Sequence, residues 1–278
     1  NDRAAPSNPF IEVHPMGRLG ENAYRFEGET DVYEAIEAVC RSYNIDRSRI
    51  VLRGSSLGGV GAWQLGLKRP DKFVAVGPAA GPVDTYVFAN SPWKHFVRLD
   101  PLTPWQETML HLVDAIDYTA NAGMVPVVAA MGDQDPYFSS HLLIENAFAK
   151  EDIPFNGIVA PDAGHGLSAA AQEQLKRLGE YAARGIDPFP KHIRFVTWTL
   201  KFSRCHWIEV LGLAEHYRRA EINARVADDG AITIAEPQNI TRFAIHSPAV
   251  PGRDGSVTIG GTRVALPTTV AEPAHPLL

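Results

Sequence analysis

Hydrophobic residues follow two alternating patterns along the first two thirds of the chain. Short, nearly continuous apolar runs predict strands at 50–52, 73–76, 125–131 and 155–160, with a shorter extended candidate at 10–13. Apolar residues spaced three or four apart predict helices over 30–43, 57–69 and 105–116, one from Ser139 or Ser140 to 148, and one beginning at Ser168. Strands that alternate with helices through short connections indicate an α/β protein with a mainly parallel, doubly wound sheet.

The pattern changes after the segment 185–190. Apolar and polar residues then alternate with a period of two, which predicts half-buried strands. The alternating positions are Val196, Trp198, Leu200, Ile222, Ala224, Val226, Ile232, Ile234, Phe243, Ile245, Val257 and Ile259. We therefore divide the chain into an α/β unit, residues 1–186, and a small antiparallel β module, residues 187–278, whose proline-containing tail is expected to be loose.

The composition excludes several other classes of protein. The 278 residues are 45% hydrophobic and 21% charged, as in an ordinary globular chain. A net charge of -6 without a basic stripe argues against nucleic-acid binding. No apolar run approaches the roughly 20 residues that a membrane span requires.

Two further features concern the start of the chain and its cysteines. Residues 1–3 include no initiator Met and no signal-like apolar core, so we interpret the start as processed, trimmed or incomplete, and the compartment stays open. Cys40 and Cys205 are too few for a disulfide scaffold or a zinc site. We expect two buried free thiols, although a single bridge would also be consistent.

A glycine-rich corner follows the apolar run 50–52. Residues 54–58 match the pattern G-x-S-x-G, in which a serine lies on a strained turn between a strand and a helix. Ser56 is the serine in register, and side chains at positions 54 and 58 are expected to collide where the turn tightens. A Gly/Ser-rich loop without chemical function is the alternative, because short motifs also occur by chance.

A serine nucleophile needs a base and a third group that orients the base. On a doubly wound sheet such groups lie at the carboxyl ends of strands. Asp133 and Asp135 follow the run 125–131, and His165 follows the run 155–160 in a loop flanked by glycines. The order Ser, Asp, His is one that serine hydrolases on such a sheet use. The residues alone leave the choice between the two aspartates open.

Several segments together resemble a known family. Ile45-Asp46, Arg49-Ile50, Leu52, 54–59, 132–135 and 164–166 resemble the α/β-hydrolase fold, and most closely its prolyl-oligopeptidase-like and feruloyl-esterase-like serine hydrolases. The resemblance covers about residues 10–184. It implies that Asp135, the last position of a G-x-x-D segment, is the acid of the triad, and that Asp133 caps a turn. The β module resembles, more diffusely, a domain that some bacterial members append.

The resemblance also implies an oxyanion hole. In that family one donor is the backbone N–H after the nucleophile, here Leu57, and the other comes from a loop after an earlier strand. Only residues 10–13 precede the first predicted helix, so the sheet is expected to lack its first strands. We favour missing upstream sequence as the reason, and a separate polypeptide that completes the sheet is the alternative.

Other residues have two interpretations each. Arg18 would contact a substrate carbonyl or pair with Glu29 or Asp31. Trp93 and His95 would line a substrate cleft or form the small core of their own loop. No His, Cys or carboxylate set has metal-ligand spacing, so we predict no metal and no cofactor.

Three functions are consistent with these observations. The first is a serine esterase with Ser56, Asp135 and His165 as its triad, and the second is a peptidase with the same chemistry. The third is an inactive hydrolase fold that binds carbohydrate or protein through the β module. The substrate is accordingly a small-molecule ester or a peptide. The β module would cover the site as a lid, bind polysaccharide or mediate a homo-oligomer, and the sequence does not rank these roles.

Overall fold

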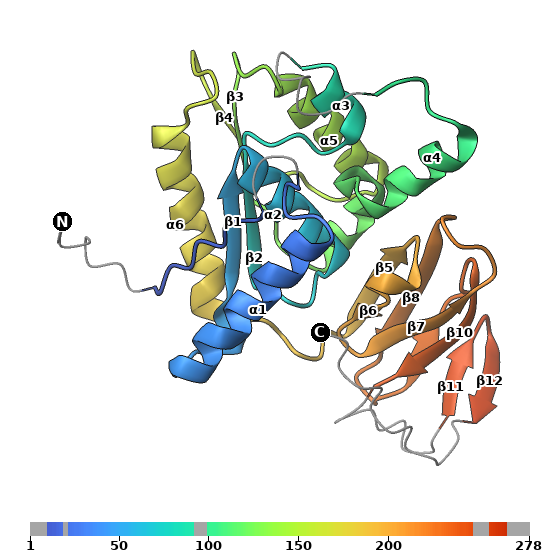
Figure 1. Cartoon of the computed structure of the whole chain (residues 1–278). Coiled ribbons are helices and arrows are strands. Elements are labelled where there is room, and N and C mark those ends of the chain that lie inside the picture. Colours follow the sequence, from blue (N-terminus) through green and yellow to red (C-terminus); the bar gives the residue numbers. More distant parts are fainter. Residues whose placement is uncertain (1–9, 19–21, 92–98, 247–255, 266–278) are drawn as a thin grey trace.

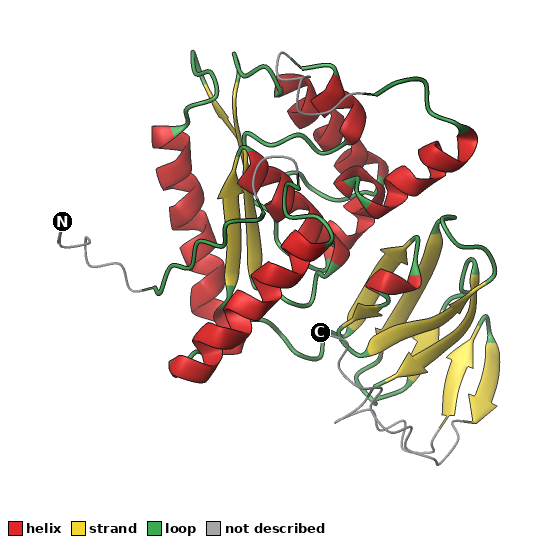
Figure 2. Ribbon diagram, in the orientation of Figure 1, coloured by secondary structure: helices red, strands yellow, loops and turns green. Residues whose placement is uncertain are grey.

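The computed structural model describes residues 10–18, 22–91, 99–246 and 256–265 of the 278-residue chain. In these residues a parallel sheet covered by helices is followed by a body made almost entirely of strands (Figures 1 and 2). Each body has a hydrophobic core of its own, with Trp63, Phe73 and Ile144 in the first and Phe195, Trp207 and Ile222 in the second.

The parallel sheet has four strands in the part of the chain that the structure describes. They lie side by side in sequence order, β1 (Val51–Ser55), β2 (Ala75–Ala79), β3 (Ala129–Gly132) and β4 (Gly157–Ala160). All three pairings are parallel. Helix α6 (Ser168–Arg184) covers one face, and helix α2 (Leu57–Lys68) packs on the other (Figure 1). The predicted α/β class with a mainly parallel sheet is confirmed, and the fold is of the α/β-hydrolase type.

The first helix and the first predicted strand differ from expectation. Helix α1 (Glu27–Ser42) begins three residues before Thr30, because Phe26, with φ 47°, turns the chain into the helix earlier. Its predicted end near residue 43 is correct. Residues 10–13 form no strand; they are irregular and exposed, and no described strand pairs with them.

The predicted helix over 105–116 is also wrong in its extent. The chain forms α4 (Pro104–Met109) and then two 3-10 segments, η2 (Leu110–Leu112) and η3 (Ala115–Gly123). Asp114, in an extended conformation, separates the two 3-10 segments. Two shorter elements, η1 (Arg47–Arg49) and α3 (Thr85–Ala89), complete the helices of the described part of the α/β unit.

Strand and helix limits elsewhere shift by a few residues. The apolar run 125–131 forms a continuous strand only from Ala129, although Val127 already pairs with Val76 of β2 in an isolated parallel bridge. Helix α5 (Phe138–Lys150) begins before the two serines expected to cap it, and Ser140 instead accepts a hydrogen bond from Val83 N at 2.8 Å. In α6, Leu178 and Ala182 are buried as predicted, whereas Leu175 is exposed.

The described residues of the β module form two sheets. The order of the larger is β12 (Thr262–Ala265), β11 (Ser256–Ile259), β9 (Ile232–Ile234), β8 (Ala220–Val226) and β5 (His192–Thr197). The smaller is β10 (Ile240–Ile245), β7 (Ile208–Leu213) and β6 (Arg204–Cys205). All pairings are antiparallel except β9 with β11, which is parallel. Trp198 and Leu200 leave the strand register, because the chain turns into η4 (Leu200–Phe202).

The module docks on one end of the α/β unit through buried polar groups. Asn121 of η3 is fully buried, and its side chain donates to Leu67 O and Val196 O and accepts from Val196 N. Trp198 Nε1 donates to Asp117 O at 3.0 Å. Leu67 lies at the end of α2 away from its first residue, and an α-helix of this length is about 17 Å long. The module therefore binds the end of α2 that is remote from the glycine-rich corner.

The cysteines, the boundary between the two bodies and the absence of a membrane span were also predicted from the sequence. Cys40 and Cys205 are free thiols, as the sequence indicated; Cys205 is buried in the module, whereas Cys40 is only partly buried, contrary to expectation. The predicted boundary at 186/187 falls between the last residue of α6 and the first of β5. Among the described residues, no helix combines the length and apolar character needed to cross a membrane.

Candidate active site

Ser56 lies at the corner between β1 and α2. Its backbone has φ 58° and ψ -119°, a conformation that a residue with a side chain rarely adopts. The corner is held by the next strand, since Ser56 N donates to Ala79 O at 2.9 Å. A Cβ at Gly54 would lie 2.1 Å from Gly58 O, so glycine is required there. The sequence motif thus has the local geometry of a nucleophile elbow.

The second glycine of the motif has a different role from the one predicted. A Cβ at Gly58 would meet no atom within 4 Å, so no collision restricts this position. The close approach occurs one residue later, where a Cβ at Gly59 would lie 2.3 Å from Ala79 O. Helix α2 therefore packs against the end of β2 at Gly59. This contact depends on the tertiary position of β2.

Three side chains from three strand ends meet at this corner. His165, in the loop after β4, places Nε2 2.8 Å from Ser56 Oγ and Nδ1 2.9 Å from Asp135 Oδ2. Asp135 follows β3, and its side chain is fully buried, whereas 30% of the His165 side chain is exposed. The chain of contacts thus runs from a buried carboxylate to a serine hydroxyl at a partly open surface.

The second oxygen of Asp135 is also engaged. Tyr137 N donates to Asp135 Oδ1 at 2.8 Å, so both carboxylate oxygens have fixed partners. The Tyr137 ring lies edge-on to the His165 ring, with 5.9 Å between centroids, and its hydroxyl is 3.4 Å from Ser91 Oγ. Tyr137 was not singled out from the sequence, because an aromatic residue two positions after an acid carries no recognised signal.

Asp133 and Asp162 lie near this arrangement without entering it. Asp133 Oδ1 accepts from Ala163 N at 3.3 Å, and Asp162 Oδ1 accepts from Gln134 Nε2 at 3.4 Å, so both join the two loops. Gly132 allows the loops to approach, because a Cβ there would lie 2.1 Å from Ala163 O. The two loops are thereby held together with His165 facing Asp135.

Leu57 is the first residue of α2, and its backbone N–H therefore has no acceptor within the helix. Among the described residues, no other backbone carbonyl accepts from it. A helix N-terminus with a free N–H beside a serine hydroxyl is suited to bind a developing negative charge.

The three remaining candidates are not brought to the corner by described contacts. Arg18 forms a bidentate ion pair with Asp31, at 2.7 and 2.8 Å, on the exposed surface of α1. This pair raises the pKa of Arg18 and lowers that of Asp31. Trp93 and His95 lie outside the described residues. In the described part of the chain, no group of three His, Cys, Asp or Glu side chains has the arrangement of a metal site.

The fold and this arrangement are those of a serine hydrolase of the α/β-hydrolase type. Comparison with known families then identifies the branch: residues 18–186 match the prolyl oligopeptidase family, and the chain belongs to it. An 81-residue segment is 32% identical to the bifunctional acetylxylan esterase/xylanase XynS20E of Neocallimastix patriciarum. That segment is 28% of this chain and only 12% of the fungal protein.

Several solved structures are similar to part of the chain at lower identity. A puromycin-hydrolysing peptidase of Mycobacterium tuberculosis is 20% identical, with a TM-score of 0.46, over 56% of this chain and 26% of its own. The S-formylglutathione hydrolase of Agrobacterium tumefaciens is 21% identical, with a TM-score of 0.46, over 56% of this chain and 57% of its own. The fluorophosphonate-binding serine hydrolase FphF of Staphylococcus aureus is 16% identical, with a TM-score of 0.49, over 59% and 69%.

Proposed function

We propose that this chain cleaves a carboxylic ester through an acyl-enzyme on Ser56, with His165 as the base and Asp135 as the group that orients it. The observation that carries the proposal is the pair of contacts from His165, 2.8 Å to Ser56 Oγ and 2.9 Å to Asp135 Oδ2. Both distances are those of hydrogen bonds, and the groups follow the order and roles that activate a serine.

In the proposed reaction, Asp135 accepts a hydrogen bond from Nδ1–H of His165, which holds the ring in the tautomer whose Nε2 can accept a proton. As Ser56 Oγ attacks the ester carbonyl, its proton passes to Nε2, and His165 then donates that proton to the departing alkoxide. A water deprotonated by the same nitrogen hydrolyses the acyl-serine. Tyr137 N fixes the second oxygen of the carboxylate, so the histidine is held against Ser56 in one orientation.

Leu57 N–H is the oxyanion donor that we assign. It precedes the first intrahelical hydrogen bond of α2 and follows the nucleophile directly in sequence. A single donor of this kind typically contributes about a hundred- to a thousand-fold in rate. Ser56, with φ 58°, has the strained backbone of a nucleophile elbow, a turn in which the N–H of the next residue contributes to the oxyanion hole.

We prefer an ester substrate over a peptide because of one relative. The 81-residue match is to a protein whose name states an ester-cleaving activity, acetylxylan esterase. The family match favours the second candidate, a peptidase, since the family is named for an oligopeptidase. Both candidates use the same triad. They differ in whether the leaving group is an alkoxide or an amine, which His165 has to protonate in either case.

The test has two parts. A fluorophosphonate probe is expected to label the protein, and Ser56→Ala should lose both labelling and hydrolysis, with a fall in kcat on the order of a million-fold. Ser55→Ala, the neighbouring serine on β1, is the matched control and should keep both. Absence of labelling in the unmodified protein would favour an inactive binding fold instead.

The second part compares substrates in parallel. Nitrophenyl acyl esters, acetylated oligosaccharides and peptide amides are assayed with the same enzyme preparation. The ester proposal predicts a larger kcat/KM for at least one ester class than for every amide. A larger value for a peptide amide would replace it with the peptidase.

A further inference from the structure

A gap interrupts the ladder between β2 and β3, the two inner strands of the described parallel sheet. Before the gap, Val128 N donates to Val76 O at 2.8 Å. After it, Ala80 N donates to Ala130 O at 2.9 Å. The regular spacing of a parallel ladder would place the N–H of residue 78 against Val128 O between these two bonds. Residue 78 is proline, which has no N–H, so the rung is missing.

Gln174 of α6 fills this gap. Its Nε2 donates to Val128 O at 2.8 Å and to Pro78 O at 3.0 Å, one carbonyl from each strand. Both partners are carbonyl oxygens, which only accept, so the amide NH2 group faces the strands and the amide oxygen does not. Gln174 is 1% exposed and Val128 is fully buried, so loss of this donor would leave a buried carbonyl short of a partner.

Pro78 lies directly beside the corner that carries Ser56. In the register of β1 and β2, Pro78 is opposite Gly54, the first glycine of the G-x-S-x-G segment. The next residue of β2 is Ala79, whose carbonyl accepts from Ser56 N at 2.9 Å. A displacement of β2 at Pro78 would therefore move the group that anchors Ser56.

The other carbonyl belongs to the segment that leads to the acid of the proposed triad. Val128 directly precedes β3, which ends at Gly132, three residues before Asp135. Asp135 N donates to Gly132 O at 3.1 Å, so the position of the carboxylate follows the end of β3. The side chain of Gln174 thus holds together the two strands whose ends place Ser56 and Asp135.

We propose that Gln174 is a positioning residue of this site. It replaces the missing rung and keeps Ser56 and Asp135 at the separation that His165 bridges with its two hydrogen bonds. The role rests on the proposed hydrolase function, since it concerns the same three groups. Gln174 acts through β2 and β3, and a misplacement of reacting groups by about 1 Å can cost roughly a hundred-fold in rate.

The first test replaces the amide by a side chain of similar length without donors. Gln174→Met should lower kcat for the best ester by about ten- to a hundred-fold and leave KM within about two-fold, because the change affects the alignment of Ser56 and not substrate binding. The rate of fluorophosphonate labelling should fall with kcat. The midpoint of thermal unfolding should also fall, by roughly 5 to 10 °C, since two buried carbonyls lose a donor.

Pro78→Ala offers a rescue that depends on the missing rung. The substitution supplies a backbone N–H opposite Val128 O, so the double variant Pro78→Ala/Gln174→Met should recover most of the lost kcat and of the lost midpoint. Pro78→Ala alone should stay close to the unmodified protein, because Gln174 still spans the two strands. A loss of kcat caused only by poorer packing of α6 would not be repaired by a backbone N–H.

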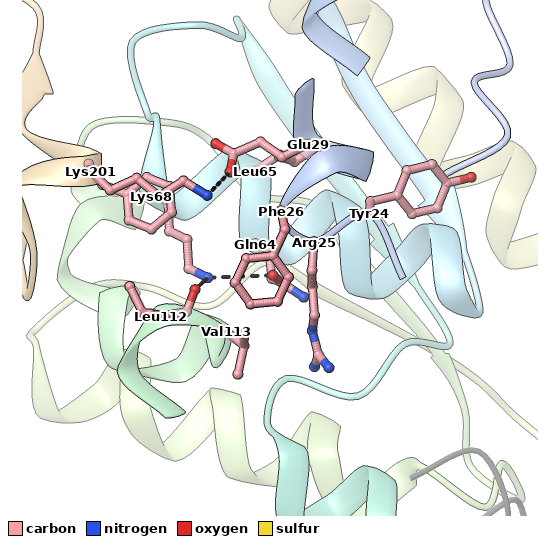
Figure 3. A pocket seen from close by; sticks show the side chains of 11 residues that line it. Tyr24, Arg25, Phe26, Glu29, Gln64, Leu65, Lys68, Leu112, Val113 and Lys201 are labelled. Carbon is pink, nitrogen blue, oxygen red and sulfur yellow. Dashed lines mark hydrogen bonds and ion pairs between the residues drawn. The ribbon is translucent and has the colours of Figure 1, made fainter. Parts of the chain in front are cut away.

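Two other glutamines serve as matched controls. Gln172 is exposed on the same helix, and Gln172→Met should change neither kcat nor the midpoint. Gln64 is buried like Gln174, but it lines a polar cavity at the far end of α2 with Arg25 and Lys68 (Figure 3). Among the described residues its amide bonds groups of that cavity and no strand carbonyl. Gln64→Met should therefore lower the midpoint and leave kcat unchanged.

The outcomes separate this role from the hydrolase function on which it rests. A Gln174→Met variant that loses stability but keeps kcat, or a double variant no better than Gln174→Met, would overturn the positioning role while the unmodified enzyme stays active. If Gln174→Met does not fold, the double variant should fold and hydrolyse the ester, and a second failure overturns the proposal. An unmodified protein without labelling or hydrolysis would overturn the hydrolase function and the positioning role with it. Recovery of the midpoint by Pro78→Ala would then still show whether Gln174 supplies the missing rung.

Discussion

Carboxylates are used in opposite ways at the two ends of the α/β unit. At the carboxyl ends of the strands, Asp135 bonds a backbone N–H and one histidine, and the chain of contacts ends at Ser56. At the junction with the β module, Glu151 pairs with both Arg194 and Arg219. The first network ends on a group with a proton to transfer, whereas the second closes on itself as an ion cluster.

The difference shows which features belong to chemistry and which to docking. The catalytic candidate combines a buried acid, a partly exposed base and a strained backbone at Ser56, a combination typical of functional sites. The residues of the docking network have ordinary backbone conformations. Its Glu151 carboxylate pairs with guanidinium groups that carry a full positive charge. It also lies far from the serine, because the module contacts the end of α2 that is remote from Ser56. The described contacts of the module are therefore made away from this corner.

The largest expected effect comes from breaking the first network. Asp135→Asn keeps the shape of the side chain but removes the carboxylate that holds the His165 tautomer and stabilises the imidazolium, so kcat should fall about ten-thousand-fold. Steady-state hydrolysis of the best ester measures it, with the folded state checked by circular dichroism. Asp133→Asn, two residues away, should leave kcat nearly unchanged. An equal loss of kcat in both variants would contradict the assignment of Asp135 as the acid of the triad.

Substitutions at the docking interface should lower the stability of the fold and leave the catalytic rate unchanged. Asn121→Ala removes three buried hydrogen bonds and leaves backbone groups of Leu67 and Val196 unpaired, which should cost about 3 kcal/mol. Urea unfolding gives the loss, and kcat of the folded fraction should stay the same. Asn146→Ala, an exposed asparagine on α5, is the control. A change in kcat with unaltered stability would contradict the separation of the two regions.

The elbow offers a matched pair of glycines. Gly59→Ala places a methyl group against Ala79 O and should destabilise the fold by about 1–3 kcal/mol and lower kcat, since the corner has to move. Gly58→Ala fills open space in a helix and should stabilise the fold by up to about 1 kcal/mol. Equal effects of the two changes in thermal unfolding would be inconsistent with the packing described.

The smallest effect concerns pH. Burial tends to raise the pKa of Glu221, but hydrogen bonds from Arg194 and Arg219 outweigh it, so its pKa lies below the ordinary 4.5. Stability from this group is present above about pH 4.5 and is lost as the pH falls through the lowered value in the folded state. Glu221→Gln should flatten the acid limb of the stability curve measured by urea unfolding. An unchanged acid limb would mean that the interface ion pairs contribute little.

Local sequence determined the parts of the site that depend on neighbours along the chain. The G-x-S-x-G segment requires glycine at 54 because the turn is tight within five residues, and the apolar run before it can only be a strand that enters the corner. The positions of His165 and of an acidic pair after predicted strands followed from the same local patterns. The α/β class followed from the alternation of apolar runs and helical stripes.

Tertiary structure alone decided which groups meet. Gly59 is restricted by Ala79 O of another strand, and Tyr137 acquires its contacts from the loop that carries His165. The helix start at Glu27, the 3-10 segments after α4 and the parallel pairing of β9 with β11 likewise depend on packing partners that no local pattern encodes. Backbone turns are set over a few residues, whereas side-chain contacts and strand partners depend on segments brought together only by folding.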